Sequence, residues 1–342
     1  MEGTMFRRKP VLAALGVVAA AAVSITVVKA QAPIRVSVNE VIVPVTVTDE
    51  KGRFVSNLVK DDFKVYDENK EQKIDFFSHE QSQPIVIGFL VDTSNAMKIH
   101  WAKYKEATTE LMLNLLPGDK KYSGYLISYG TTAELVADTS TDPEKMVAKM
   151  DRIKPGGGSA LFDAIYLACT SRKTVNGEPF EPRRVLVIIG DGHDNASKKS
   201  LQEVVEIAKR NLVTVYAMSS VTFGEHTASE DILSTLTAET GGKVEEPLRN
   251  PYKDVAGYLS QPQDAGNFAL TVGTGQYTAE ISSAIFRSIA ALSGEITTQY
   301  VIRYTPDIGP GSDSKQFRKI KVAVNLPGVE LRYRNGYYPF AP

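Results

Sequence analysis

Residues 84–97, which read PIVIGFLVDTSNAM, constrain the fold more than any other stretch of the sequence. The first half is an uninterrupted apolar run, which is typical of a strand buried on both faces of a parallel sheet. The run ends at Asp92 and three small polar residues, and a helical pattern begins at about Lys98, so Ser94 or Asn95 can cap that helix. Ligands of open α/β sheets bind beyond the carboxyl ends of the strands, so this loop is the first candidate for a functional site.

The sequence after this stretch alternates between strand and helix patterns. Apolar runs of strand length occur at residues 85–91, 122–129, 133–137, 185–189 and 212–218, and helical patterns occur at residues 98–116, 143–151, 160–171, 198–210 and 230–240. A last helical pattern at residues 279–292 follows residues 247–275, which lack any period and collect Pro, Gly, Asn and Gln. This order predicts a doubly wound, Rossmann-like α/β domain over residues 83–297, with a loop or insertion at residues 247–275.

The segments on either side of this domain carry a different pattern. Apolar residues alternate with others in residues 31–82, most clearly at residues 41–47, and residues 298–342 return to strand patterns around a Pro-Gly turn at residues 327–328. Neither segment has enough strands for a core of its own. We therefore expect the two segments to pair into one small antiparallel β-sandwich, with the α/β domain inserted between them.

Residues 1–30 have the composition of a secretory signal. Arg7, Arg8 and Lys9 precede a charge-free apolar stretch at residues 11–28, and Ala-Gln-Ala at residues 30–32 offers small residues for cleavage. The alternative is an uncleaved N-terminal anchor, since about 18 apolar residues can just span a bilayer. In both cases we expect the rest of the chain to be periplasmic, envelope-associated or extracellular, with membrane contact only if the segment stays uncleaved.

Charge and cysteine usage restrict the partners. The 342-residue sequence has a formal net charge of −1 and no long basic run inside the mature chain, so nucleic acid is not an expected partner. The one cysteine, Cys169, cannot form an intramolecular disulfide. It follows Leu161 and Ile165 at four-residue spacing, which predicts a buried, inert thiol on one helix face.

Three loops at strand ends, or at the start of helices packed on the strands, carry oxygen ligands. They read DTSNA at residues 92–96, GGGSALFD at residues 156–163 and GDGHDN at residues 190–195. Two carboxylates and two or three hydroxyls, without a Cys or His pair at metal spacing, suit a hard cation such as Mg²⁺ rather than zinc.

These loops resemble the metal-ion-dependent adhesion site (MIDAS) of the von Willebrand factor type A (VWA) domain, in which an Asp-x-Ser-x-Ser loop, a distant Thr and a later Asp surround a cation. Matched by position, Asp92 and Ser94 correspond to the first loop, Ser159 stands for the Thr, and Asp191 corresponds to the later Asp. The resemblance spans residues 84–292. The segments on either side resemble the VWFA-related family of exported bacterial proteins.

The resemblance implies a protein-binding module. Such a site holds Mg²⁺, with Ca²⁺ and Mn²⁺ as further candidates, and keeps an open coordination position that an Asp or Glu carboxylate of a protein ligand completes. The same resemblance implies that Asn95, Gly158, His193 and Asp194 form the ligand-binding rim around the metal.

Besides Ser159, which replaces the Thr but keeps a hydroxyl, two further positions depart from the family pattern. Ala96 stands where the motif has its second serine, and Gly190 precedes Asp191 where Thr or Ser is common. Water can replace one neutral ligand of Mg²⁺, so the missing serine predicts weaker metal binding and does not by itself require its absence. A metal-free variant of the same fold is the alternative. The alternative function is a metal-independent envelope scaffold that uses the fold for assembly.

Other roles compete for some residues of the three loops. Asp163 lies inside a helical pattern and is expected to hydrogen-bond nearby backbone. Asp194 and Asn195 could cap the helix expected from residue 198 instead of binding a ligand. Tyr104 falls on the apolar stripe of its helix and is expected to be a packing residue.

A hydrolase is the minor alternative. Ser159, His193 and Asp191 or Asp163 include the residue types of a catalytic triad. However, the sequence has no Gly-x-Ser-x-Gly elbow, and no strand ends directly at the serine. We therefore do not expect an enzyme.

Overall fold

In a computed structural model of the protein, residues 40–79, 84–98, 101–171, 182–220, 228–247, 274–307 and 316–339 are described. The predicted signal segment and nearly all of the predicted loop at residues 247–275 lie outside these ranges. Within the ranges, no helix combines the length and the apolar character needed to cross a membrane.

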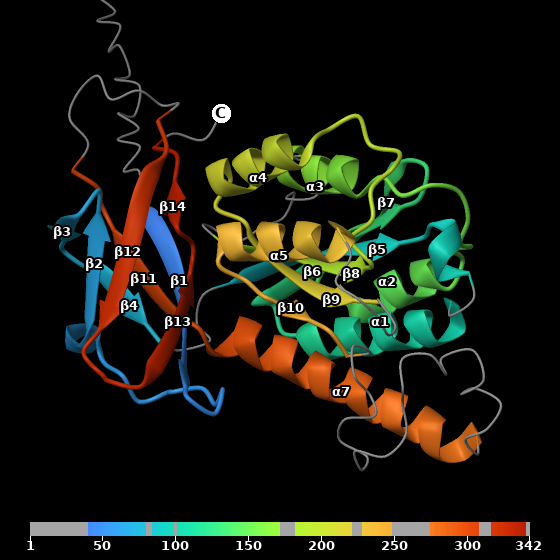
Figure 1. The fold of residues 1–342 in the computed structure, drawn as a ribbon, viewed down its shortest axis with the longest axis horizontal. Coiled ribbons are helices and arrows are strands. Elements are labelled where there is room, and N and C mark those ends of the chain that lie inside the picture. The colour runs from blue at the N-terminus through green and yellow to red at the C-terminus, as the bar shows by residue number, and fades with distance from the viewer. Residues whose placement is uncertain are drawn as a thin grey trace, which may run out of the picture. The chain divides into compact units, whose positions relative to one another are not determined.

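A six-stranded sheet forms the centre of the α/β domain, in the strand order β10-β9-β8-β5-β6-β7 (Figure 1). Its strands are β5 (Ile85–Asp92), β6 (Tyr122–Tyr129), β7 (Ala133–Ser140), β8 (Arg183–Gly190), β9 (Thr214–Ser219) and β10 (Val244–Glu245). Neighbouring strands run parallel, except for the antiparallel pair β6 and β7. Every residue of β5 is buried, as its uninterrupted apolar run predicts.

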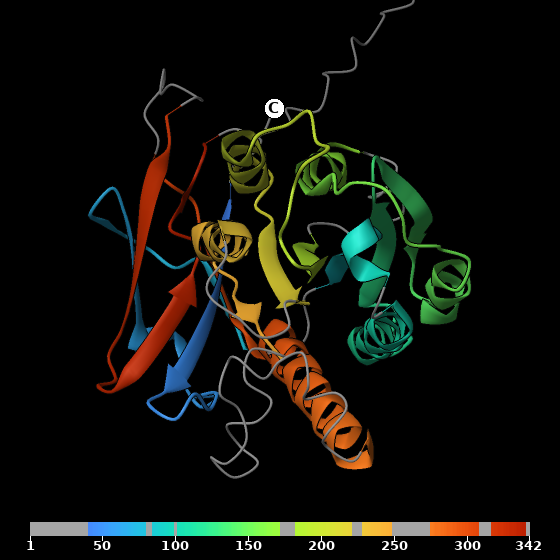
Figure 2. The same cartoon turned by 45° about the vertical axis from the view of Figure 1, so that its right-hand side comes forward.

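Helices cover both faces of this sheet (Figure 1, Figure 2). The first face carries α1 (Trp101–Leu115), α2 (Pro143–Met150) and α7 (Thr274–Thr298), and the second carries α3 (Leu161–Thr170), α4 (Leu201–Arg210) and α5 (Ala228–Thr240). Alternate side chains of β5 therefore enter different cores: Phe89 lies in the core with Leu111 of α1, and Leu90 lies in the core with Ile165 of α3. The domain is doubly wound, as predicted.

The helices differ by a few residues in extent from the sequence prediction, and α4 and α7 show the physical reasons. α4 begins at Leu201 rather than at residue 198, because Ser200 and Glu203 form a capping box in which each side chain accepts the other residue's backbone N–H. α7 extends to Thr298 instead of ending at residue 292. Its last turn contains the buried Glu295, whose partners are distant in sequence and leave no local helical signal.

Two four-stranded antiparallel sheets form the β-sandwich. The strands are β1 (Val41–Asp49), β2 (Phe63–Asp67), β3 (Lys70–Gln72), β4 (Phe76–Ser78), β11 (Tyr300–Tyr304), β12 (Arg318–Val324), β13 (Val329–Tyr333) and β14 (Gly336–Tyr337). Their orders are β13-β1-β11-β4 and β14-β12-β2-β3, so each sheet combines strands from before and after the α/β domain (Figure 1). Val43 and Val65, one from each sheet, lie in the shared core. The predicted fold class is confirmed.

A buried ionic network around Glu295 joins α7 to strands of both the sandwich and the central sheet. Glu295 is fully buried. Its carboxylate accepts hydrogen bonds from Arg332 Nη2 at 3.0 Å and from Thr46 Oγ1 at 3.3 Å, and it lies 3.2 Å from Lys243 Nζ. Because these partners come from β13, β1 and the residue before β10, one carboxylate fixes three segments to the end of α7.

A second buried carboxylate, Asp67 at the end of β2, organises the sandwich. It is fully buried and accepts hydrogen bonds from Arg318 Nε at 2.8 Å, from the Tyr337 hydroxyl at 2.7 Å and from the Tyr304 hydroxyl at 3.2 Å. These donors lie on β12, β14 and β11, so Asp67 links strands of both sheets.

We expect Asp67→Ala to destabilise the protein by about 2 to 3 kcal/mol, because it leaves two buried hydroxyls and a guanidinium without their acceptor. Urea unfolding followed by circular dichroism measures this loss. Asp61→Ala is the matched control, since Asp61 is exposed, and it should change stability by less than about 0.5 kcal/mol. Equal effects of the two substitutions would contradict the structural role of Asp67.

Cys169 lies on the buried face of α3. It belongs to the same hydrophobic core as Ile165 and Leu161, one and two turns earlier on that helix. Burial raises the pKa of its thiol to about 12. A thiol that stays protonated at neutral pH is a poor nucleophile, which agrees with the predicted inert, buried residue.

Candidate metal centre

Three strands of the central sheet end side by side at one edge. β5 ends at Asp92, which is in register with Tyr129 at the end of β6, and the other neighbour of β5, strand β8, ends at Gly190. Small and polar residues follow the ends of β5 and β8 directly. Because parallel strands share one carboxyl edge, their loops converge there.

Asp92 is the most unusual polar group at this edge, because its carboxylate is fully buried. Its Oδ1 accepts a hydrogen bond from the Ser94 N–H at 2.7 Å, whereas its Oδ2 has no hydrogen-bond partner among the described residues. Burial raises the pKa of the Asp92 carboxyl to about 6, hydrogen bonds from Ser94 lower it, and the nearby Asp191 raises it. A buried carboxylate oxygen without a donor is costly, so this oxygen is the strongest candidate ligand for a cation.

Backbone hydrogen bonds tie the second loop to the first. The Asn95 N–H donates to the Gly157 carbonyl at 3.0 Å, and the Gly156 N–H donates to the Thr93 carbonyl at 2.6 Å. Gly157 has a φ of +85°, and a Cβ at this position would lie 2.2 Å from the Thr131 hydroxyl oxygen. Only glycine fits this close approach without strain.

Ser159 connects the second loop to the third. It is 2% exposed. Its hydroxyl donates to the His193 carbonyl at 2.6 Å, and its N–H donates to Asn195 Oδ1 at 2.9 Å. Since the hydroxyl proton is used in this bond, the oxygen lone pairs of Ser159 remain able to ligate a metal.

The third loop follows Gly190 at the end of β8. The half-buried Asp191 accepts a hydrogen bond from the His193 N–H through Oδ1 at 2.8 Å. A Cβ on Gly190 would lie 2.3 Å from the Tyr129 hydroxyl and 2.9 Å from the Asp92 Cβ. The Thr or Ser that is common at this position in the VWA pattern therefore does not fit beside Tyr129, which accounts for the departure seen in the sequence.

The remaining predicted residues lie around this edge. Asn95 and His193 are exposed and Gly158 is half-buried, so all three border the surface near the strand ends. Ala96 lies in a short 3-10 helix, η2 (Asn95–Met97), and is exposed. The position of the absent second serine is thus at the surface rather than in the core.

Asp194 and Asp163 hold the loops and helices in place. The Asp194 carboxylate accepts hydrogen bonds from the Phe162 N–H at 2.8 Å and from the Ser197 hydroxyl at 2.6 Å. The Asp163 carboxylate accepts the Lys198 and Lys199 N–H groups, each at 3.1 Å. The predicted backbone role of Asp163 is confirmed.

The suggestion that Asp194 or Asn195 caps the next helix is wrong. Ser200 is the N-cap of α4, whereas Asn195 accepts the Ser159 N–H and Asp194 accepts a donor at the start of α3. Ser200 caps α4 because it directly precedes the first turn and its hydroxyl can accept the Glu203 N–H. Asp194 and Asn195 are used instead in contacts between loops.

Two tyrosines beneath Asp92 belong to the site and were missed by sequence reasoning. The Tyr104 hydroxyl accepts the Asp92 N–H at 3.1 Å and donates to the Ile189 carbonyl. The Tyr129 hydroxyl donates to the same carbonyl at 3.3 Å. Tyr104 falls on the apolar stripe of α1, so nothing in the sequence pattern separates it from a packing residue.

The donor set fits a hard divalent cation. Asp92, Asp191, Ser94 and Ser159 offer carboxylate and hydroxyl oxygens only. Over the described ranges, no three His, Cys, Asp or Glu side chains gather closely enough to hold a metal by themselves. Two carboxylates and two hydroxyls, with water completing the shell, match the preference of Mg²⁺ for oxygen and retained water.

A doubly wound sheet with an acidic, hydroxyl-bearing edge defines the class of α/β domains that bind ligands beyond their strand ends. Within this class, residues 87–246 match the family model described as von Willebrand factor type A domain. This part of the chain is a VWA domain, as the sequence resemblance implied. Domains of this family commonly mediate protein–protein interaction, and many bind a divalent cation in a MIDAS.

Solved structures similar to this one include further VWA proteins. The SpRpn10 VWA domain is 15% identical, with 47% of this chain and 86% of that chain covered and a TM-score of 0.38. The conserved hypothetical protein BatB from Bacteroides thetaiotaomicron is 14% identical, covering 58% and 99%, with a TM-score of 0.38. Proximal thread matrix protein 1 from the mussel byssus, described with a zinc-occupied MIDAS motif, is 11% identical, covering 67% and 49%, with a TM-score of 0.40. A comparison with curated proteins gave no match.

Proposed function

We propose that the protein is an exported binding protein whose VWA domain engages a protein ligand at the carboxyl edge of the central sheet, through a divalent cation. The observation that carries this proposal is the buried Asp92 Oδ2, which has no hydrogen-bond partner among the described residues and lies in the electrostatic field of Asp191. The family match of residues 87–246 supports the protein-binding role. The basic and apolar composition of residues 1–30 supports export.

Asp92 and Asp191 would hold the cation together with the hydroxyls of Ser94 and Ser159. Mg²⁺ is the first candidate, and Ca²⁺ and Mn²⁺ are alternatives of the same oxygen-seeking class. The bound cation supplies a positive charge with an open coordination position, which suits an Asp or Glu carboxylate of the ligand. The exposed Asn95 and His193 lie where they can contact the rest of that ligand.

A metal-independent scaffold is the rival function. Ala96 favours it, because the second serine of the motif is absent. Capture of a partner by the immobilised protein, with and without a chelator, distinguishes the two functions. The chelator should abolish capture if the cation mediates binding, and it should leave capture unchanged if the protein is a metal-independent scaffold.

Hydrolysis is the least supported function. The Ser159 hydroxyl donates to the main-chain carbonyl of His193 at 2.6 Å, so its proton supports loop structure, whereas a triad serine gives its proton to an imidazole nitrogen. Turnover of an ester or peptide substrate that disappears in His193→Ala would favour an enzyme over the binding protein proposed here.

We expect calorimetric titration with Mg²⁺ to show weak, saturable binding, and Ala96→Ser to strengthen it about ten-fold, the effect of roughly 1.4 kcal/mol from one added oxygen ligand. The exposure of Ala96 means that the serine should be tolerated without loss of stability.

Ala102→Ser is the control for this titration, since Ala102 is an exposed alanine on α1 outside the three loops. It should leave the affinity unchanged. Absence of heat in both the wild-type protein and Ala96→Ser would overturn the metal proposal. Binding in Ala96→Ser alone would mean that the native site is degenerate and would favour the scaffold.

A further inference from the structure

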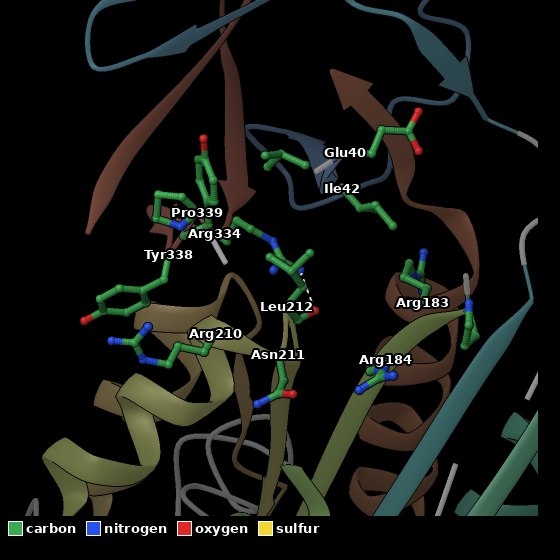
Figure 3. A pocket seen from close by; sticks show the side chains of 13 residues that line it. Glu40, Ile42, Arg183, Arg184, Arg210, Asn211, Leu212, Arg334, Tyr338 and Pro339 are labelled. Atoms are coloured by element: carbon green, nitrogen blue, oxygen red, sulfur yellow. Dashed lines mark hydrogen bonds between the residues drawn. The ribbon is translucent and has the colours of Figure 1, made fainter. Parts of the chain in front are cut away.

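A pocket of about 380 Å³ lies at the start of β8, at the other end of this strand from the candidate metal centre (Figure 3). It is lined by residues that open β8, follow α4, begin β1 and surround β14. The eight residues of β8 separate the two sites by about 23 Å at roughly 3.3 Å per residue. The volume lies in the range of pockets that hold small molecules.

The lining of this pocket is strongly basic. Four arginines line it, namely Arg183, Arg184, Arg210 and Arg334, against one acid, Glu40. Glu40 lies 3.4 Å from Arg303, and Arg210 lies 2.7 Å from Glu206. Glu40, the acid of the lining, therefore forms its ion pair with Arg303, which is not one of the four arginines that line the pocket.

Arg183 and Arg334 differ from ordinary surface arginines because they are 5% and 3% exposed. Arg183 donates through Nη2 to the Ile296 carbonyl. Arg334 donates through Nη2 to the Leu212 carbonyl at 2.9 Å, a bond visible in Figure 3. The Nε atoms of both arginines are buried without a hydrogen-bond partner over the described part of the chain.

No carboxylate of the described residues forms an ion pair with Arg183 or Arg334. Their interactions are with neutral oxygens, such as the Ile296 and Leu212 carbonyls, and the positive charge of Arg183 contributes to lowering the pKa of Arg334. Burial lowers the pKa of the Arg334 guanidinium to about 10, so it remains charged at neutral pH. Two buried like charges without an anion are unfavourable in a folded protein.

We propose that this pocket binds a small molecule through a phosphate or carboxylate group, with Arg183 and Arg334 as the principal contacts. Guanidinium groups recognise these oxyanions through charge-assisted hydrogen bonds. The anchored Nη2 atoms hold each guanidinium in place before the ligand arrives, and no carboxylate of the described residues neutralises its positive charge. Arg184 adds positive charge at the same lining.

The test is calorimetric titration of the whole chain with inorganic phosphate and, separately, with citrate, in EDTA so that the candidate metal centre takes no part. Sodium chloride at matched ionic strength gives the baseline. Saturable binding of phosphate supports a phosphorylated ligand, and saturable binding of citrate supports a carboxylate ligand. In either case Arg183→Gln and Arg334→Gln should each weaken binding about ten-fold or more, the loss expected for a charge-assisted hydrogen bond.

Two further variants keep the test decisive if the buried arginines are needed for folding. Asn211→Asp adds a negative charge to the lining at nearly constant size, and it should weaken anion binding several-fold in a folded protein. Arg152→Gln removes an exposed arginine outside the pocket and should leave binding unchanged. The proposal is overturned if neither anion binds the folded wild-type protein, or if Asn211→Asp and both glutamine variants bind as tightly as the wild type.

Discussion

Asp92→Asn is expected to abolish divalent-cation binding and, without metal, to stabilise the fold. The first effect follows because the amide removes the negative charge and one anionic oxygen from the centre of the proposed ligand set. The second follows because Asp92 is fully buried and its Oδ2 lacks a hydrogen-bond partner among the described residues. One substitution should therefore change metal binding and stability in opposite directions.

The pH dependence gives the size and sign of the stability effect. The pKa of the Asp92 carboxyl rises from 3.8 to about 6 in the metal-free folded protein, so the folded state binds this proton more tightly than the unfolded state does. Wild-type stability should fall as pH rises from about 4 to 6, by on the order of 3 kcal/mol, and stay level above that range. Asp92→Asn should lack this pH-dependent loss of stability, because the amide does not titrate. At neutral pH it should therefore be more stable than the wild-type protein by about 1 to 3 kcal/mol.

Urea unfolding in EDTA and in excess Mg²⁺, at several pH values, measures both effects. Wild-type protein should gain about 2.7 kcal/mol at a metal concentration of 100 times Kd, and Asp92→Asn should gain nothing. Asp138→Asn, at an exposed position of β7, is the control and should behave as the wild type. An Asp92→Asn protein that Mg²⁺ stabilises as much as the wild type would rule out Asp92 as a ligand.

Glu295→Ala should cause the largest loss of stability, about 3 to 5 kcal/mol, because it removes one member of a buried ionic network. Arg332, Lys243 and Thr46 would lose their common acceptor. These partners tie the end of α7 to strands β13, β10 and β1, so we also expect less protection of the β1 amides in hydrogen exchange.

Glu330→Ala on β13 is the control, because Glu330 is exposed, and its effect should stay within about 0.5 kcal/mol. Glu295→Gln keeps the size of the side chain and one acceptor oxygen. Its loss of folding stability should therefore lie between the losses of Glu295→Ala and Glu330→Ala. A Glu295→Ala protein as stable as Glu330→Ala would mean that the network contributes no net stability.

Much of the fold was predictable because its signals are local. The apolar run before Asp92 and the period of two at residues 41–47 each report burial on one or both faces of a strand. The end of α7 was not predictable in this way. Glu295 lies in its last turn, and its partners are between 37 and 249 positions away in sequence, so no local period reveals them.

The candidate site shows the same division. Asp92, Ser159 and Asp191 could be named from three loops in a recognisable order. The hydroxyl of Tyr104 beneath Asp92 and the fit of Gly190 against Tyr129 could not, because both depend on which strand ends lie side by side.

The sequence by itself determined the order of strands and loops and the residue types at the carboxyl edge of the sheet, since these depend on apolar periodicity and on short motifs. Only the tertiary structure decided that Asp92 Oδ2 and the Nε atoms of Arg183 and Arg334 are buried without hydrogen-bond partners among the described residues. The physical reason is that burial and pairing of a charge depend on neighbours from distant segments. Arg183 reaches a carbonyl 113 positions away, and Arg334 reaches one 122 positions away.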